Sequence, residues 1–261
     1  MKLKIENLGL GVNGVALRFR DEFIFGEFTN RDRLVSKEAI KLSKEAVDKC
    51  EYLGGKIVTI WLGFDGFDYP FQIDYVEYWN RIKDAIKEIA EYAKTKGIEI
   101  SIEYKPYQPR AYSMIPDSTT TLLMIDEIGL DNVGVTLDYC HMLMRRESPA
   151  YSLALVANRG KLSGIHLNDG YGLNDDGLIT GTISIPQTLE FIYYLKKFKY
   201  DGVIYFDTFP IRENPYEEIS ANIDLFKKYS EIIDKIGIQK LENMVSQSEG
   251  LTMSKILLEI L

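Results

Sequence analysis

The sequence predicts an α/β protein of the TIM (β/α)8 barrel class, and three features of its 261 residues lead to this prediction. Short apolar runs rich in Val, Ile and Leu have the composition of buried parallel strands. Longer segments with apolar residues at helical spacing separate these runs, and alternating units of this kind form parallel sheets with right-handed crossovers. Polar residues able to do chemistry follow several runs directly, and barrel proteins carry their sites at that end of the strands.

Six apolar runs are expected to form the strands. Glycines lie before several of them or at their start, at Gly55, Gly97, Gly134 and Gly202, as is typical of helix C-caps and αβ turns. No GxGxxG or Walker motif follows any of the runs, which counts against a doubly wound, nucleotide-binding sheet. The expected strands are residues 12–19, 57–62, 99–104, 133–138, 162–167 and 203–207.

The segments between the strands carry apolar residues on one helical face, as Ile40, Val47 and Cys50 illustrate for the first of them. Pro149 and Pro215 each open such a segment, where the missing N–H of proline leaves no helical hydrogen bond unmade. The expected helices are residues 36–52, 74–95, 118–128, 149–158, 186–198 and 215–236.

Six strand–helix units fall short of the eight that close a barrel. Two explanations stay open: the chain lacks the first one or two βα units, or the long loops 20–36 and 63–73 contain short strands. We expect residues 1–236 to form the barrel and residues 237–261 a helical tail. The tail ends in the apolar sequence SKILLEIL, which suits a cover for an open sheet edge, a subunit contact or an ordinary packed helix.

Composition narrows the function classes. A net charge of −8 argues against nucleic acid as a partner. The two cysteines, Cys50 and Cys140, form no disulfide framework, which suits a reducing cytoplasm. No apolar run reaches 18 residues and the first residues lack a signal-peptide pattern, so neither a membrane span nor a membrane partner is expected. We therefore predict a cytoplasmic protein.

Four expected strands end in residues that commonly bind metal ions. Glu103, Asp138, His166 and Asp207 each follow or close an apolar run, and the carboxyl ends of parallel strands meet at one face of a barrel. A single strand-end Asp is more often a helix N-cap, and a single buried His is usually structural. Because four successive strands share the feature, the sequence predicts one divalent-metal site here. Carboxylates with one imidazole favour Mn²⁺, with Co²⁺, Mg²⁺ and Zn²⁺ as the other candidates.

A second group of ligand-type residues lies next to the first along the chain. His141 follows Asp138 by three residues, and Asp175 and Asp176 lie in the loop after His166. A second metal ion close to the first would suit this arrangement. The alternative is that Asp175, Asp176 and the following glycine form a simple turn.

The strand-end motifs resemble those of the xylose isomerase-like TIM barrels, and most of all those of the rhamnose isomerase branch. The resemblance covers roughly residues 10–230. The matching segments are 61–72 (WLGFDGFDYPFQ), 103–106 (EYKP), 138–141 (DYCH), 166–169 (HLND) and Asp207.

This resemblance implies roles for individual residues. Glu103, Asp138, His166 and Asp207 would bind the first metal, and His141 with the loop aspartates the second. Lys105 would contact a substrate oxygen, so that Lys105, Glu103 and Asp207 form the catalytic set. We also expect Trp61, Phe64 and Phe209 to line the sugar pocket, although an aromatic side chain is more often part of the core packing.

The implied activity is that of a metal-dependent aldose–ketose isomerase that works by a 1,2-hydride shift on a sugar, in a homo-oligomer. A ketose 3-epimerase on the same scaffold, a metal-dependent endonuclease-type phosphodiesterase and a truncated, non-catalytic barrel are the alternatives. Two histidines and the negative charge count against the phosphodiesterase. The sequence departs from the family in the loop ligands, where Asn174 or Gly177 falls at one of the two expected aspartate positions, and in lacking a third histidine.

Overall fold

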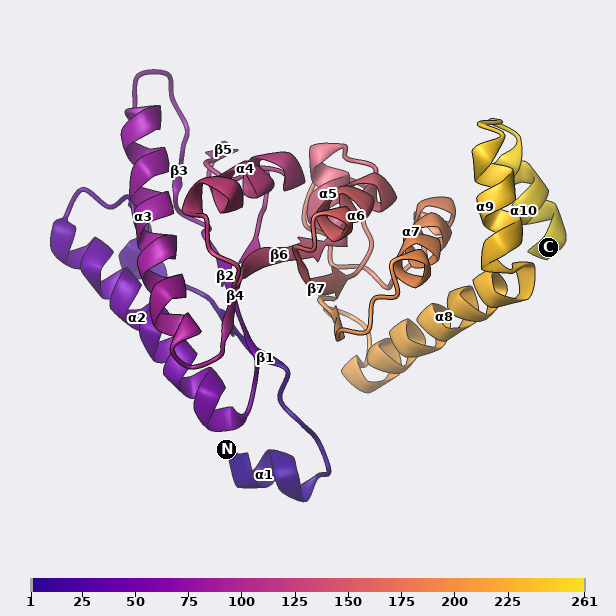
Figure 1. Cartoon of the computed structure of the whole chain (residues 1–261), viewed down its shortest axis with the longest axis horizontal. Coiled ribbons are helices and arrows are strands. Elements are labelled where there is room, and N and C mark those ends of the chain that lie inside the picture. The colour runs from indigo at the N-terminus through magenta and orange to yellow at the C-terminus, as the bar shows by residue number, and fades with distance from the viewer. Residues whose placement is uncertain (1, 261) are drawn as a thin grey trace.

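The computed structural model describes residues 2–260 as helices arranged around a curved parallel sheet (Figure 1). Six strands form the sheet in the order in which they occur along the chain, and every neighbouring pair is parallel. This is an open, TIM-barrel-like α/β fold, so the predicted fold class is confirmed. The strands are β1 (Gly14–Leu17), β2 (Ile57–Trp61), β4 (Glu99–Glu103), β6 (Val133–Asp138), β7 (Leu162–Leu167) and β8 (Ile204–Phe206).

The two long loops add no strand to this sheet. One of them contains β3 (Gly66–Phe67), which pairs antiparallel with β5 (Tyr112–Ser113) in a separate two-stranded sheet. The other contains a 3-10 turn, Asp21–Phe23, and the start of a helix. Within residues 2–260, β1 and β8 each pair with one strand only, and the sheet has two free edges.

The long helices begin and end within three residues of their predicted bounds. Between residues 33 and 236, one short helix was not predicted: α5 covers seven residues directly after β6. Its residues are buried on most sides, so no helical period of polar and apolar residues marks it. The helices are α1 (Lys2–Asn7), α2 (Arg33–Leu53), α3 (Tyr75–Lys94), α4 (Ser118–Ile128), α5 (Tyr139–Arg145), α6 (Pro149–Asn158), α7 (Ile185–Lys197), α8 (Pro215–Ile236), α9 (Ile238–Ser246) and α10 (Thr252–Ile260).

Side-chain capping explains where several helices begin. The side chains of Asp32, Asp74, Asp117 and Asn214 accept hydrogen bonds from backbone N–H groups in the first turns of α2, α3, α4 and α8. Asp138 caps α5 in the same way by accepting a hydrogen bond from the N–H of His141 at 3.0 Å. The N-cap explanation for a strand-end Asp therefore holds for Asp138, and the cap also determines where its carboxylate lies.

Alternation along the strands separates the core from the interior of the barrel. In β2, Val58 and Ile60 are buried in the core that includes α2 and α3, whereas Thr59 and Trp61 line the central cavity. In β4 the last residue, Glu103, also faces the cavity. Because a strand has a period of two, the residue types that do chemistry are brought together inside the curved sheet.

The C-terminal helices pack against α7 and α8 (Figure 1). Leu241 of α9 and Ile256 of α10 form a small apolar cluster with Leu189, Ile192 and Ile233. Of the three roles expected for the apolar tail, packing as ordinary helices is the one that these contacts support. The division into a barrel unit and a tail at residue 236 stays a prediction. None of the helices in residues 2–260 combines the length and the apolar character that a membrane crossing requires.

The core around β4 yields a stability prediction. Ile100 is fully buried in this central strand, and Ile100→Ala would leave a cavity that lowers the free energy of unfolding by about 2–5 kcal/mol. Urea denaturation measures the change. Leu123→Ala removes an exposed side chain of α4 and should change stability by less than about 0.5 kcal/mol. Equal effects of the two variants would contradict the assigned core.

Candidate metal centre

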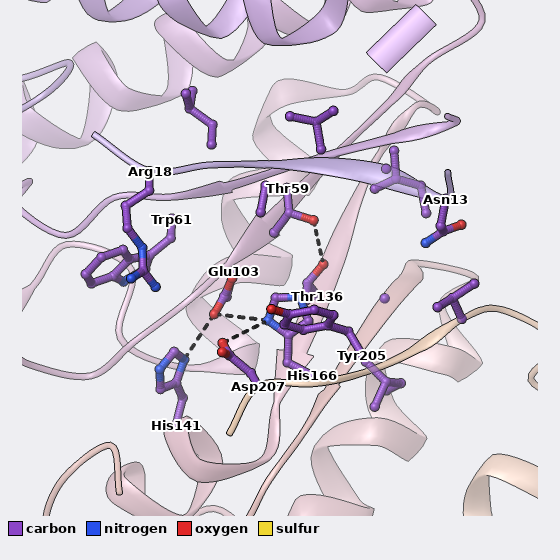
Figure 2. Close-up of a pocket in the computed structure, with 18 of the residues that line it drawn as sticks. Asn13, Arg18, Thr59, Trp61, Glu103, Thr136, His141, His166, Tyr205 and Asp207 are labelled. Carbon is purple, nitrogen blue, oxygen red and sulfur yellow. Dashed lines mark hydrogen bonds and ion pairs between the residues drawn. The ribbon is translucent and has the colours of Figure 1, made fainter. Parts of the chain in front are cut away.

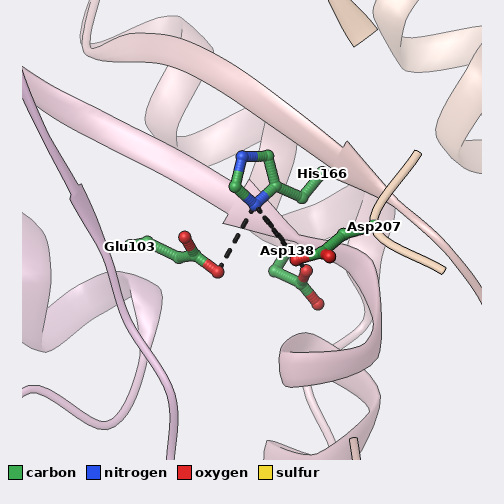
Figure 3. A group of neighbouring side chains, drawn as sticks. All are labelled: Glu103, Asp138, His166 and Asp207. Carbon is green, nitrogen blue, oxygen red and sulfur yellow. Dashed lines mark ion pairs between the residues drawn. The ribbon is translucent and has the colours of Figure 1, made fainter. Parts of the chain in front are cut away.

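Four side chains from four strand ends converge at the carboxyl end of the sheet (Figure 3). Each offers one ligand atom, and these atoms all lie within 4.8 Å of one another. Glu103 and Asp138 are the last residues of β4 and β6, His166 lies in β7, and Asp207 directly follows β8. The structure therefore brings together the four residues that the sequence predicts for the first metal site.

The Nδ1 atom of His166 lies among three carboxylate oxygens without hydrogen bonding to any of them. It is 3.4 Å from Glu103 Oε1, 3.7 Å from Asp207 Oδ2 and 4.0 Å from Asp138 Oδ2. The atom is buried and has no hydrogen-bond partner among the described residues. Buried polar atoms without a partner are rare in folded proteins. A divalent cation between these side chains would explain the unpaired Nδ1, because carboxylate oxygens and imidazole are suitable ligands.

Burial and crowding change the pKa values of the four ligands. Burial raises the pKa of Asp138 to about 6. Burial, together with the charge of Glu103, also raises the pKa of Asp207. Burial acts in the same direction on Glu103, but the positive charges of His166 and His141 outweigh it and lower the pKa of this carboxyl. For His166 the surrounding carboxylates, with Glu103 first, overcome burial and raise the pKa to about 9.

A second group of ligand atoms adjoins the first and shares Asp138 with it. Asp138, His141 and Asp175 each offer one atom within 4.8 Å of the others. His141 Nδ1 donates a hydrogen bond to the carbonyl of Tyr104 at 2.9 Å, because a carbonyl can only accept. This bond orients the ring so that Nε2 points toward Asp175 Oδ2, at 3.2 Å. Metal-binding histidines commonly donate their other ring N–H to a backbone carbonyl in this way.

Lys105 lies at this second group. Its Nζ forms an ion pair of 2.9 Å with Asp175 Oδ2, the same oxygen that faces His141. Glu103 and Lys105 line the same cavity, but the cation pairs with Asp175 rather than with Glu103. Burial would raise the pKa of Asp175, yet His141 and Lys105 hold it well below its usual range.

Asn168 holds the centre together from behind the ligands. It is fully buried, and its Nδ2 donates to both carboxylate oxygens of Asp138, at 3.3 and 3.2 Å, and to the carbonyl of Asp207 at 3.1 Å. Its Oδ1 accepts a hydrogen bond from the N–H of Cys140 at 2.8 Å. Asn168 thereby connects the ends of β6, β7 and β8. The sequence alone does not indicate this role.

The loop after β7 brings Asp175 to the centre but turns Asp176 away from it. Asp169 is fully buried and accepts hydrogen bonds from the N–H groups of Ile183 and Ser184, which closes the base of the loop. Asp176 accepts a hydrogen bond from the N–H of Tyr171 at 2.8 Å and belongs to neither ligand group. In this structure Asp176 shapes the loop, whereas Asp175 faces His141.

The centre opens into a cavity of about 620 Å³, within the range of about 300–1,000 Å³ usual for small-molecule sites (Figure 2). Trp61 and Phe209 line it, as predicted for the sugar pocket, whereas Phe64 packs against the core. Among the lining residues that the sequence analysis did not name, Arg18 and Tyr205 carry polar groups able to contact a ligand. The position of Arg18 directly after β1 is a signal that could have identified it, and the alternation of Tyr205 with Asp207 is another.

These features define a TIM-barrel protein with a candidate divalent-metal centre at the carboxyl ends of its strands. Residues 2–229 match the family model described as xylose isomerase-like TIM barrel, and the chain belongs to that family.

Individual relatives include sugar isomerases. The chain is 30% identical over 176 residues to a probable sugar isomerase of Mesorhizobium japonicum, an alignment that covers 65% of this chain and 38% of that protein. It is 25% identical over 226 residues to the xylose isomerase of Thermus thermophilus, covering 84% of this chain and 58% of that enzyme. The chain thus spans between about two fifths and three fifths of the length of these relatives.

A solved structure of a D-tagatose 3-epimerase-like protein has the same fold. The two structures superpose with a TM-score of 0.75 and 21% sequence identity, over 90% of this chain and 82% of the other. At this level of identity the likeness concerns the fold alone.

The raised pKa of His166 predicts that metal binding releases a proton. A metal ion binds the deprotonated imidazole, and below pH 9 the metal-free ring carries a proton. Mn²⁺ affinity should therefore rise between pH 6 and 8. At pH 7 about one proton should leave per ion bound at this site, which calorimetry in buffers of different ionisation enthalpy measures. An affinity and a heat that depend on neither pH nor buffer would contradict the assignment of His166 as a ligand.

The contacts of Asn168 predict a role in holding the ligands in place. Asn168→Ala removes the donors to Asp138 and Asp207, and Mn²⁺ affinity should fall by about 10–100-fold. Asn132→Ala is the matched control, because the Nδ2 of Asn132 also links two segments, by donating to the backbone carbonyls of Ala90 and Ile98 at the opposite end of β4. Titration of both variants tests this. Equal losses of affinity in the two would show that Asn168 acts only through stability.

Proposed function

We propose that the chain provides the catalytic barrel of a divalent-metal-dependent aldose–ketose isomerase, an intramolecular oxidoreductase acting on a sugar. The observation that carries this proposal is the pair of adjoining ligand groups that share Asp138, with Lys105 at the second group. Membership of the xylose isomerase-like family and the two isomerase relatives support it.

The charge of the centre suits two divalent ions. Glu103, Asp138, Asp175 and Asp207 supply four carboxylates in the two groups, and Lys105 forms an ion pair with one of them. The first group would hold one ion, and Asp138, His141 and Asp175 the second. When bound, such ions polarise a sugar carbonyl and stabilise negative charge on its oxygens. Manganese is the ion we propose, because the ligands mix carboxylates with imidazole.

The chain's own side chains would position the sugar and exclude water. Lys105 would donate a hydrogen bond to the sugar oxygen on which negative charge develops during the hydride shift between C1 and C2. Glu103 and Asp207 would hold the first ion from opposite sides of His166. Trp61 and Phe209 would present apolar faces to the sugar ring and reduce the water around the reacting carbons.

A ketose 3-epimerase is the second candidate, because the chain shares its fold with the D-tagatose 3-epimerase-like structure. In that reaction Glu103 and Asp207 would act as base and acid on a carbon between them, with a single ion. A non-catalytic barrel is the third candidate, because within residues 2–260 the sheet has six strands rather than the eight of a closed barrel. A cytoplasmic location, expected from the cysteine usage, and a homo-oligomeric state, expected from the family resemblance, are further proposals.

Calorimetric titration of Mn²⁺ into the chelator-stripped chain separates these candidates. Two binding events are expected, the tighter one lost in Glu103→Gln and the weaker one lost in His141→Gln. One event in the parent chain would favour the epimerase. No binding by a folded sample would refute the enzymatic proposal.

The fate of a deuterium label then distinguishes isomerisation by hydride shift from isomerisation by proton exchange. Isomerisation by hydride shift should carry deuterium from C2 of an aldose to C1 of the ketose, whereas proton exchange would lose it to solvent, and NMR of the product shows which occurs. Loss of label to solvent would refute the hydride shift.

Lys105→Met should lower kcat by about 10²–10³-fold if the lysine stabilises developing charge. Lys87→Met, at an exposed position of α3, should leave kcat unchanged.

A further inference from the structure

Arg18 is a cation at the mouth of the cavity that has no anionic partner among the residues that the structure describes. It directly follows β1, its side chain is exposed, and it lines the same cavity as the metal-ligand candidates. Its guanidinium lies over the ring of Trp61 with 5.5 Å between Cζ and the ring centroid (Figure 2). Across residues 2–260 no hydrogen bond and no carboxylate oxygen within 4.0 Å engages this guanidinium, although acidic residues outnumber basic ones by 39 to 31.

Trp61 adds a second unused donor at the same place. Its Nε1–H is buried and has no hydrogen-bond partner among the described residues, whereas buried polar groups in folded proteins are nearly always paired. Lys105 Nζ lies 5.4 Å from the centroid of the same ring. Two cations and one indole N–H donor therefore gather around a single aromatic side chain that lines the cavity.

The cavity therefore has a negatively charged part at the metal centre and a positively charged part at Arg18. Glu103 and Asp207 lie at the metal centre, and Arg18 lies near enough for its positive charge to oppose the rise in the pKa of Asp207. Lys105 is already paired with Asp175, so Arg18 is the cation left for a bound molecule. A guanidinium presents a planar set of donors that matches carboxylate and phosphate oxygens.

We propose that Arg18, together with the Trp61 Nε1–H, binds an anionic group of the substrate, either a carboxylate or a phosphate, at the end of the sugar remote from the metal centre. The inference rests on the proposed sugar-isomerising function and narrows its substrate class to acidic sugars. The carbonyl end of the sugar would lie at the metal centre beside Lys105, and the face of Trp61 would lie along the carbon chain. The cavity of about 620 Å³ has room for this orientation.

Three sugars that share a skeleton test the proposal: glucose, glucuronate and glucose 6-phosphate differ only in the group at C6. Binding to the Mn²⁺-loaded chain is followed by the fluorescence of Trp61 in a Trp79→Phe background, since these are the only two tryptophans. At least one acidic sugar should bind about tenfold or more tightly than glucose, the gain expected from a charge-assisted hydrogen bond. Whichever of the two binds more tightly identifies the carboxylate or the phosphate as the preferred group.

Variants of two neighbouring arginines give the matched comparison. Arg18→Gln should abolish the preference for the acidic sugar, and Arg18→Lys should keep part of it. Arg20→Gln removes the same charge from an exposed arginine that does not line this cavity, and it should keep the full preference. If all three sugars bind equally well and Arg18→Gln changes nothing, the inference is overturned while the isomerase proposal stands, and Arg18 is then only a surface partner of Trp61.

A sugar-independent measurement separates the failure of this inference from the failure of the proposed function. Should no sugar bind to a chain that binds Mn²⁺, the proposed function fails, and inorganic phosphate titrated into the metal-free chain decides about Arg18. A change in Trp61 fluorescence that is lost in Arg18→Gln and kept in Arg20→Gln supports an anion site at Arg18. The same response in the parent chain and in Arg18→Gln overturns the inference.

Discussion

The register of the parallel sheet is the constraint on which the candidate site depends. Asp138 of β6 pairs with His166 of β7, whereas Glu103 of β4 pairs with Thr136, two residues earlier in β6. Two residues correspond to about 6.6 Å along a strand, so the ligands start from different levels of the barrel. Glu103 has one methylene more than an Asp, which suits a ligand that must reach from the lower level. A shift of one residue in any pairing would turn a ligand out of the cavity.

The same register brings several carboxylates together in a buried place, and neighbouring side chains compensate their negative charge. Asn168 donates to Asp138, and the positive charge of His166 faces Glu103 and Asp207. Carboxylates that are removed from water need a counter-charge or a hydrogen bond. The geometry that makes a cation favourable between the strands therefore also makes the metal-free arrangement depend on the protonation of His166 and His141.

Much of the fold and of the first ligand group could be predicted, because both depend on local periodicity. The six strands and the helices from α2 to α8 carry apolar repeats of two or 3.6 residues, with α5 as the exception, since its seven residues are too short and too buried to show a period. For Phe64 and Asp176 the direction of the side chain could not be predicted. Phe64 packs into the core, and Asp176 bonds to the backbone of Tyr171, because side-chain direction in loops follows turns that no repeat encodes.

By itself the sequence determined the order of strands and helices and the residue types at the strand ends, because these follow from hydrophobic pattern and chain direction. Tertiary structure alone decided which side chains share a partner. The sharing of Asp138 by two ligand groups joins side chains from four strand ends, α5 and a loop. Lys105 and Asp175 lie 70 positions apart in the chain, and Arg18 and Trp61 lie 43 apart. Such contacts depend on how the sheet curves and on how the loops close, and neither is written in the spacing of neighbouring residues.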